Sequence, residues 1–470
     1  MQPRRFLGIT VMPEYVQVEG IERVLDNLVR MGATAVTTSP YVMELADART
    51  GSREPPDDAG AGQVRLLDRP LWGRRELFVR TAPSFVPERK LYQGLRYQPA
   101  EATDLTRKQG LLVGDFLRAA QGRHLKTYLQ VQAAIPPGYR VQFGGPVEAD
   151  QPRLPDGRVP PRRLARNGSL ASPAIRDYEH ALIRDLCRAY PDVDGYRFDW
   201  PEYPPYFLDD VFLDFSDPAR DAARRLDFNF ERMRNEAGAL YKLLHGGLTD
   251  THLNTWLDGD GGRFTLLTRL LNHPGLADWL RFKARLSDEL LEGFRRILTQ
   301  AAGVKKELIA HAFPPPFSLA SGIDFARVGR RANGIAVKLY TMHWSMMLRF
   351  YGDVLVKANP KLTERLLVRF LVRLFDIADD DGLPRLADYG YPEPNVAHPA
   401  GLQAQARKIT LAQREAGTTP VYALAHGYGR ADDFRRRLES AWRASGQKVW
   451  INRYGYLSDE KMKIVGEVCR

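Results

Sequence analysis

Eight short segments with the character of β-strands recur along this chain, and stretches of helical length separate them. Strands that alternate with helices favour a parallel sheet that is covered by helices. Eight such units favour closure of that sheet into a (β/α)8 barrel, which is an α/β fold, over an open sheet. The predicted strands are residues 6–11, 33–41, 125–135, 193–200, 307–313, 334–344, 420–426 and 449–456.

Several connections between these segments predict helices. Residues 18–31 carry apolar side chains at helical spacing. At the start of residues 172–190, Ser172 suits the N-cap and Pro173 suits the first helical position. Residues 431–445 predict a further helix before the last strand. The chain therefore reads as repeated strand–helix units.

Three connections are far longer than a barrel requires. Near the start of the first, residues 50–62 are rich in Gly, Pro and Asp and predict a loop. In a TIM barrel, long insertions follow the C-terminal ends of strands and build walls over the active face. We predict one TIM barrel over residues 1–470, with mostly helical insertions at about 42–123, 205–304 and 345–419.

Charge and composition exclude several classes of function. The net charge is +11, from 68 basic and 57 acidic residues, and the basic residues form separate clusters. A nucleic-acid-binding protein needs one concentrated patch or a known module, so we expect no nucleic-acid partner. No apolar stretch is long enough to span a bilayer, so we expect no membrane partner. Cys187 and Cys469 predict free thiols without a disulfide or a metal site, and we expect no cofactor.

The N-terminal segment bears on localisation. Basic residues precede a short apolar run, which is too short for the hydrophobic part of a signal peptide and is followed at once by Glu14. This pattern and the two free cysteines predict a cytoplasmic protein. An exported precursor that has lost its leader is the alternative.

The segment from Asp194 to Pro204, with the sequence Asp-Gly-Tyr-Arg-Phe-Asp-Trp-Pro-Glu-Tyr-Pro, indicates where the chemistry lies. In a strand, successive side chains alternate between two faces. Tyr196, Phe198 and Trp200 then form a packing face, and Gly195, Arg197 and Asp199 form the opposite face. Two charges in a buried strand are costly unless they pair or act in a site. The C-terminal tip of a barrel strand is where such a fold carries out its reaction.

Carboxyl groups at this strand end suit the cleavage of glycosidic bonds. Glycoside hydrolysis usually takes two carboxyl groups, one an acid and the other a nucleophile or base. Asp199 is the candidate nucleophile or base, and Arg197 beside it would keep it ionised. Glu202, three residues further on, is the candidate acid. A purely structural Arg197–Asp199 pair and a capping role for Glu202 are the alternatives.

The polar faces of the other strands predict a sugar-binding surface. Aromatic rings stack on sugar rings, while amides and charged groups bind the hydroxyls. Asp324 follows the fifth strand, and His311, His343 and His426 lie near strand ends, although each also suits a structural role. The predicted substrate-binding residues are Tyr128, Gln130, Gln132, Trp200, His311, Asp324, Lys338, Tyr340, His343, His426, Asn452 and Tyr454.

Gly195-Tyr196-Arg197-Phe198-Asp199 resembles the fourth-strand G-x-R-x-D motif of α-amylase-type glycosidases, in which the aspartate is the nucleophile. The longer form, from Asp194 to Glu202, resembles the hypothetical glycosyl hydrolase barrels. Residues 338–344 and 449–462 are similar to strand ends of such barrels. The resemblance implies a TIM-barrel glycoside hydrolase with Asp199 as its nucleophile.

Only Arg197 and Asp199 match the α-amylase pattern. This chain has Gln130-Val131-Gln132 where that family carries an aspartate in the third strand, and residues 308–313 contain no fifth-strand glutamate. We predict a glycosidase or transglycosidase that acts on an oligo- or polysaccharide. A carbohydrate-binding protein without turnover is the first alternative. A barrel isomerase or lyase for an anionic sugar, favoured by Lys338 and the basic charge, is the second.

Overall fold

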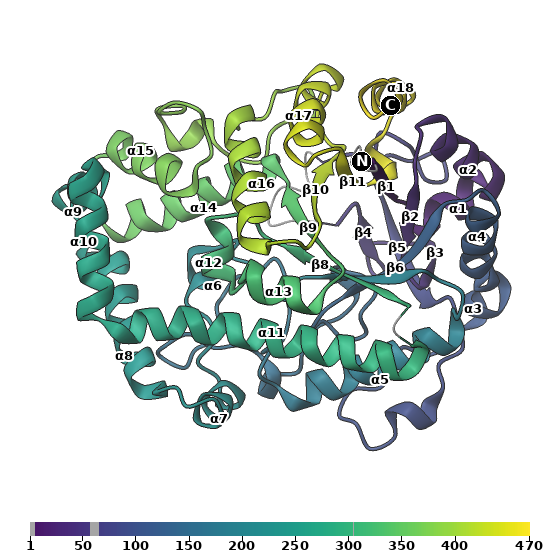
Figure 1. Ribbon diagram of the computed structural model, residues 1–470, viewed down its shortest axis with the longest axis horizontal. Coiled ribbons are helices and arrows are strands. Elements are labelled where there is room, and N and C mark those ends of the chain that lie inside the picture. The colour runs from purple at the N-terminus through teal and green to yellow at the C-terminus, as the bar shows by residue number, and fades with distance from the viewer. Residues whose placement is uncertain (1–4, 57–64, 304) are drawn as a thin grey trace.

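Eight parallel strands close into a barrel in the computed structural model, which describes residues 5–56, 65–303 and 305–470 (Figure 1). β11 closes the ring by pairing with β1, so that Trp450 lies opposite Gly8. The predicted fold class and all eight predicted strands are confirmed. The barrel strands are β1 (Phe6–Thr10), β2 (Ala35–Thr38), β6 (Lys126–Gln132), β7 (Gly195–Asp199), β8 (Glu307–Ala312), β9 (Gly334–Leu339), β10 (Val421–His426) and β11 (Lys448–Asn452).

Several predicted strands run too far at their C-terminal ends, and the overrun is largest for residues 334–344 and 449–456. β9 ends at Leu339 and the helix α14 (Thr341–Ala358) follows it, while β11 ends at Asn452 and a short 3-10 helix covers Tyr454–Tyr456. Beyond these strand ends the backbone leaves the barrel sheet and forms helical turns. Side chains beyond these ends no longer alternate between the interior and the helical layer.

Helices cover the outside of the barrel. Ser172 caps α5 (Pro173–Ala189) through its hydroxyl, which accepts from the Ile175 amide at 3.2 Å, as predicted. α5 packs beside the long α11 (Pro274–Ala302), and Phe198 of β7 stacks on Phe294 of that helix at 4.4 Å between ring centroids. α17 (Ala431–Ala444) matches the predicted last crossover helix. The predicted helix over residues 18–31 is instead two helices, α1 (Pro13–Glu19) and α2 (Ile21–Arg30), because Gly20 between them has φ +82°.

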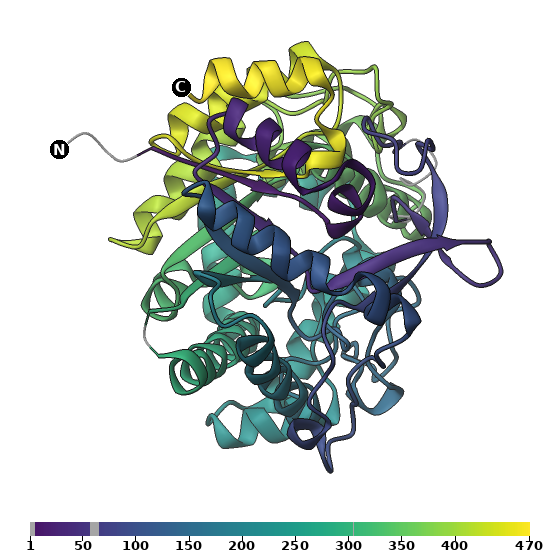
Figure 2. The same ribbon diagram turned by 90° about the vertical axis from the view of Figure 1, so that its right-hand side faces the viewer.

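A small antiparallel sheet lies in the connection after β2 and projects from the side of the barrel (Figure 2). It consists of β3 (Tyr41–Ala46), β5 (Leu77–Pro83) and β4 (Ser52–Glu54), in that order. The loop predicted over residues 50–62 is thus wrong at β4, and residues 57–62 of that prediction lie outside the described residues. β4 brings Glu54 to the barrel mouth, where it is fully buried.

The two later long connections meet on one side of the barrel (Figure 1). α9 (Asp250–Leu257) belongs to the connection after β7, and α15 (Glu364–Phe375) to the connection after β9. The carboxylate of Asp250 accepts from the amide and the hydroxyl of Thr363 at 2.9 and 2.6 Å. Segments over a hundred residues apart are therefore joined at this point. No helix in the described part of the chain is both long and apolar enough to cross a membrane.

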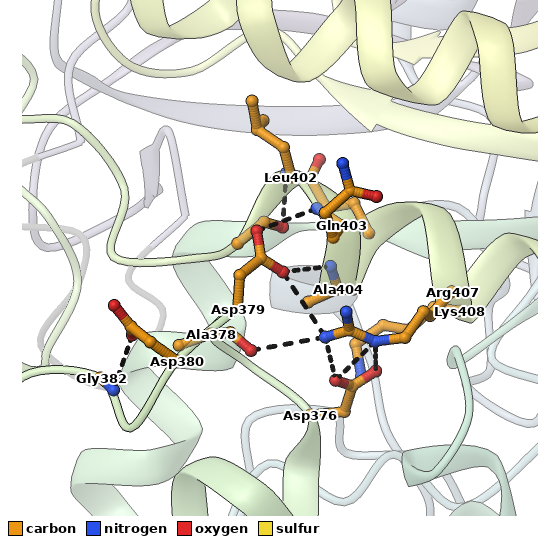
Figure 3. A network of polar contacts seen from close by, with 12 residues as sticks. Asp376, Ala378, Asp379, Asp380, Gly382, Leu402, Gln403, Ala404, Arg407 and Lys408 are labelled. Carbon is orange, nitrogen blue, oxygen red and sulfur yellow. Dashed lines mark hydrogen bonds and ion pairs between the residues drawn. The ribbon is translucent and has the colours of Figure 1, made fainter.

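Polar contacts tie the second of these connections to the barrel helix α16 (Leu402–Ala416) (Figure 3). The carboxylate of Asp379 accepts from the Gln403 and Ala404 amides at 3.0 and 2.7 Å and thus satisfies free amides at the helix start. One turn further on, Arg407 donates to Asp376 at 2.6 Å. The inserted helices are therefore anchored to the helical layer.

Candidate active site

A cavity of about 100 Å³ opens where the barrel strands end. β6, β7, β10 and β11 each place their last residue in its wall, β6 adds Gln130, and the segments beyond the strand ends supply the rest. Sixteen residues line it: Met12, Pro56, Arg65, Gln130, Gln132, Arg140, Gln142, Leu164, Asp199, Trp200, Tyr206, Tyr340, His343, His426, Asn452 and Arg453. Within this lining, Asp199 is the one carboxylate.

Asp199 ends β7 and is nearly buried. Its Oδ1 lies 2.8 Å from the Nζ of Lys338 on β9 and 3.1 Å from the Nδ1 of His311 on β8. Burial alone would raise the pKa of Asp199, but the nearby Lys338 and His311 outweigh burial and hold that pKa far below its usual range. Asp199 is therefore ionised across the physiological pH range.

Glu202 lies behind this pair, and it is fully buried. Its Oε1 is 3.8 Å from the Lys338 ammonium and accepts from the Phe313 amide at 3.0 Å, while its Oε2 accepts from the Ser321 hydroxyl at 2.5 Å. Burial raises the pKa of Glu202 to about 7, against the lowering effect of Lys338. Glu202 does not line the cavity, so its carboxyl is not positioned as the predicted acid would be.

Arg197 points into the barrel below Asp199, as the alternation of the strand predicts. Its guanidinium lies over the Trp450 ring, 3.9 Å from the centroid, and donates to the Thr10 hydroxyl at 3.1 Å. Burial lowers the pKa of Arg197 to about 10, which leaves the group charged. The sequence predicts that Arg197 keeps Asp199 ionised, with a structural Arg197–Asp199 pair as the alternative. Among the described residues, Lys338 and not Arg197 is the cation within 4 Å of that aspartate.

The three predicted histidines lie around the cavity. Burial lowers the pKa of His311 to about 4, so its imidazole is neutral beside Asp199. His343 and His426 line the wall. Burial, Arg65 and His343 keep the pKa of His426 well below its usual range, and its Nδ1 accepts from the Tyr428 amide at 3.1 Å. The site thus contains neutral imidazoles among fixed cations.

Amides and aromatic rings complete the wall at the predicted positions Gln130, Gln132, Tyr340 and Asn452. Trp200 also lines the cavity, although alternation assigned it to the packing face. Its φ of +57° turns the backbone just after β7 ends, and its ring comes within 5.3 Å of the Lys338 ammonium.

Three predicted substrate-binding residues lie elsewhere. Tyr128 is inside the lower barrel, 5.4 Å from Trp450 between ring centroids, and donates to Glu307 at 2.6 Å. Asp324 caps α13 (Phe325–Arg331) by accepting from the Arg327 amide at 3.0 Å. Tyr454 follows the end of β11 and packs away from the cavity, where it accepts from Asn27 at 2.6 Å and donates to Glu19 at 2.8 Å. Each has a structural partner in place of a ligand.

Sequence reasoning missed a buried charge cluster on the opposite wall. Glu54 pairs with Arg140 and, at 2.8 Å, with Arg453. Glu14 lies nearby, and burial raises its pKa; its Oε2 accepts from the Tyr41 hydroxyl at 2.8 Å. No local motif joins these residues, since Glu54 and Arg453 are 399 positions apart. Only the place of Arg453 within the last predicted strand, residues 449–456, could have indicated it.

Within the described ranges, no three His, Cys, Asp or Glu side chains gather closely enough to hold a metal ion.

Known proteins resemble this chain in structure rather than in sequence. Neither family models nor curated proteins match it. The PgaB (BpsB) glycoside hydrolase domain from Bordetella bronchiseptica has a TM-score of 0.54 and 11% identity, over 99% of both chains.

Two β-galactosidases are similar over 99% of this chain, each at 12% identity. The enzyme from the psychrophilic Marinomonas ef1 has a TM-score of 0.51, and the one from the Antarctic haloarchaeon Halorubrum lacusprofundi has 0.52. This chain spans only 59% and 57% of their lengths. At such low identity these likenesses establish the shared barrel fold, which is one that glycoside hydrolases use.

Proposed function

We propose that this protein is a glycoside hydrolase or transglycosidase whose reaction takes place at Asp199. The observation that carries the proposal is an ionised carboxylate at the C-terminal end of a barrel strand, in a cavity walled by amides and aromatic rings. Such a wall suits sugar hydroxyls and the apolar faces of sugar rings. Glycosidase barrels are also the fold of the similar structures.

Asp199 has the electrostatics that a nucleophile or base requires. Glycoside cleavage passes through a transition state with positive charge at the anomeric carbon, which an ionised carboxylate stabilises. Lys338 and His311 fix the same oxygen of Asp199 from two sides. The other oxygen is the one left to face the sugar.

Glu202 acts in this proposal as a positioning residue. It contacts the far side of the Lys338 ammonium and is itself fixed by Ser321 and the Phe313 amide. The leaving group must then take its proton from a protic group of the wall or from water. Substrates with leaving groups that need no protonation should therefore react best.

The test compares wild type with Asp199→Asn on a panel of aryl glycosides and natural oligosaccharides. Asp324→Asn is the matched control, because it changes a carboxylate outside the cavity lining that caps a helix and pairs with Arg327, and asparagine caps helices as well. We expect Asp199→Asn to lower kcat/KM by about a thousandfold or more, with a folded protein, and Asp324→Asn to leave it unchanged. Equal rates for wild type and Asp199→Asn would refute the proposal.

A carbohydrate-binding protein without turnover is the second candidate. It is favoured by the single carboxylate in the described cavity lining, where hydrolysis usually takes two. This candidate predicts sugar binding and no hydrolysis, even of aryl glycosides with the best leaving groups.

A further inference from the structure

A second hollow, of about 970 Å³, adjoins the cavity. It is a groove between β4 and the loop that covers residues 142–166, and Phe207 forms part of its wall. Pro56, Gln142 and Leu164 line both the groove and the cavity. A chain that lies in the groove can therefore continue to Asp199.

Among the lining residues that the structure describes, the groove carries unbalanced positive charge. Arg162, Arg163 and Arg166 line it, and no Asp or Glu is among its described lining residues. Arg163 is neutralised by Asp210 at 3.2 Å. Arg162 and Arg166 are exposed, and within the described ranges neither has a carboxylate within 4 Å. Exposed arginines elsewhere commonly have a carboxylate partner; the guanidinium of Arg385, for example, lies 2.6 Å from the carboxylate of Asp388.

The positive charge continues into the cavity. Arg140 and Arg453 share the single carboxylate of Glu54, and both line the cavity wall. Arginine remains protonated at all physiological pH values and binds carboxylate and sulfate oxygens through its fork of N–H groups. The two hollows thus form one path along which a series of anionic groups would be attracted.

The loop with these arginines is held in place before any ligand binds. Arg163 donates to the Asn167 carbonyl at 2.7 Å, and Asn167 donates to the backbone carbonyl of Glu202 at 2.8 Å. The Gly168 amide donates to the Ala134 carbonyl at 2.7 Å. Binding then requires little ordering of the backbone, which favours affinity.

The side chains of the groove disfavour a nucleic acid as its occupant. Single strands bind through aromatic rings on which bases stack. The aromatic lining residue here is Phe207, whose ring stacks on Phe350 at 4.7 Å between centroids and lies 4.6 Å from the guanidinium carbon of Arg162. Phe207 is nearly buried, so little of it is left for a base.

We propose that the groove binds the continuation of an acidic sugar chain, one with carboxylate or sulfate groups, whose reacting residue occupies the Asp199 cavity. Arg162 and Arg166 bind anionic groups of the distant residues, and Arg140 and Arg453 bind one near the cavity. This inference rests on the proposed function, since it names the class of substrate for the same site.

The test measures binding by calorimetry at low ionic strength. The probes are an oligogalacturonate, its methyl ester as the neutral match, a sulfated dextran fragment and the unsulfated fragment. The variants are Arg162→Gln/Arg166→Gln and the matched control Arg89→Gln/Arg107→Gln. The control removes two exposed arginines that are not among the described lining residues of the groove. We expect the groove variant to lose about tenfold in affinity for an acidic probe, and the control to lose less than about twofold.

Each outcome decides one question. A preference for the carboxylated or for the sulfated probe supports the proposal and identifies the anion. Equal affinity for charged and neutral probes, equal losses in the two double variants, or tighter binding of an oligothymidylate of equal charge would overturn it. The Asp199→Asn variant separates the two proposals, because it should keep its affinity for acidic chains even if no turnover is found. If wild type shows turnover but the Arg162→Gln/Arg166→Gln variant binds acidic chains as well as wild type does, only the groove proposal is refuted.

Discussion

Two buried charge clusters contribute to the cavity wall, and their compositions are inverted. On one wall, the ammonium of Lys338 lies between two carboxyl groups, those of Asp199 and Glu202. On the other wall, the carboxylate of Glu54 lies between two guanidinium groups, those of Arg140 and Arg453. The first cluster presents a carboxylate to the cavity and the second presents arginines. Under the two proposals, one cluster supplies the reactive group and the other binds anionic substituents.

The largest effect is expected from Glu54→Gln. This change leaves two buried guanidinium groups without their shared carboxylate, and removal of one partner of a buried pair costs about 3–5 kcal/mol of folding free energy. Chemical denaturation measures this loss. Glu101→Gln, which removes a fully exposed partner of Arg89, is the control and should cost less than about 1 kcal/mol. A stable Glu54→Gln protein would mean that the neighbouring Glu14 compensates for the lost carboxylate.

Glu202→Gln should change how stability depends on pH. The folded pKa of about 7 exceeds the ordinary value of 4.5, so the stabilising contribution of the protonated carboxyl is complete below pH 4.5 and is lost as pH rises to 7. Glutamine cannot ionise. The free energy of unfolding of wild type, relative to Glu202→Gln, should therefore fall by about 3 kcal/mol over this interval. A constant difference between the two proteins would show that Glu202 titrates normally.

Lys338→Met should move the acid limb of the activity profile. The lysine lowers the pKa of Asp199, so its removal raises that pKa and activity is lost at a higher pH. A shift of about one to three pH units in kcat/KM is expected. Lys408→Met is the control, because that equally buried lysine binds the carbonyls of Pro315 and Phe375 outside the site. If the acid limb of the Lys338→Met profile lies at the same pH as in wild type, the ionisation of Asp199 does not control the activity.

The smallest effect is expected at Tyr454, outside both clusters. Tyr454→Phe removes hydrogen bonds to Asn27 and Glu19, which should cost about 1–2 kcal/mol of stability and leave kcat/KM unchanged. Tyr340→Phe, in the cavity wall, should instead lower kcat/KM. If Tyr454→Phe loses activity although the protein is fully folded, Tyr454 contributes to the site as the sequence predicted.

The sequence predicts best what depends on local periodicity. The strand–helix alternation predicts all eight barrel strands, and the period of two correctly turns Arg197 and Asp199 inward. The same rule fails at Trp200 and Tyr454, because both follow the last hydrogen-bonded residue of a strand. The partners of Asp199 were harder to predict, since Lys338 and His311 come from two other strands and only barrel closure brings them together. The place of Glu54 in the site could not be predicted, because the short strand that carries it lies in a segment rich in loop-forming residues.

Trp450 has a consequence for the order of events in the proposed reaction. Its ring fills the barrel below the site, under Arg197, and Gly8 makes room for it, since a Cβ there would lie 2.2 Å from the ring. The barrel interior is therefore filled below the site, and the cavity opens at the strand ends. In the proposed reaction, the departing part of a cleaved sugar chain and the incoming water molecule both pass on that side, so the first product has to leave before water can reach the anomeric carbon. During that interval another sugar can take the place of water, and the lifetime of the first product in the entrance would then set the balance between hydrolysis and transfer.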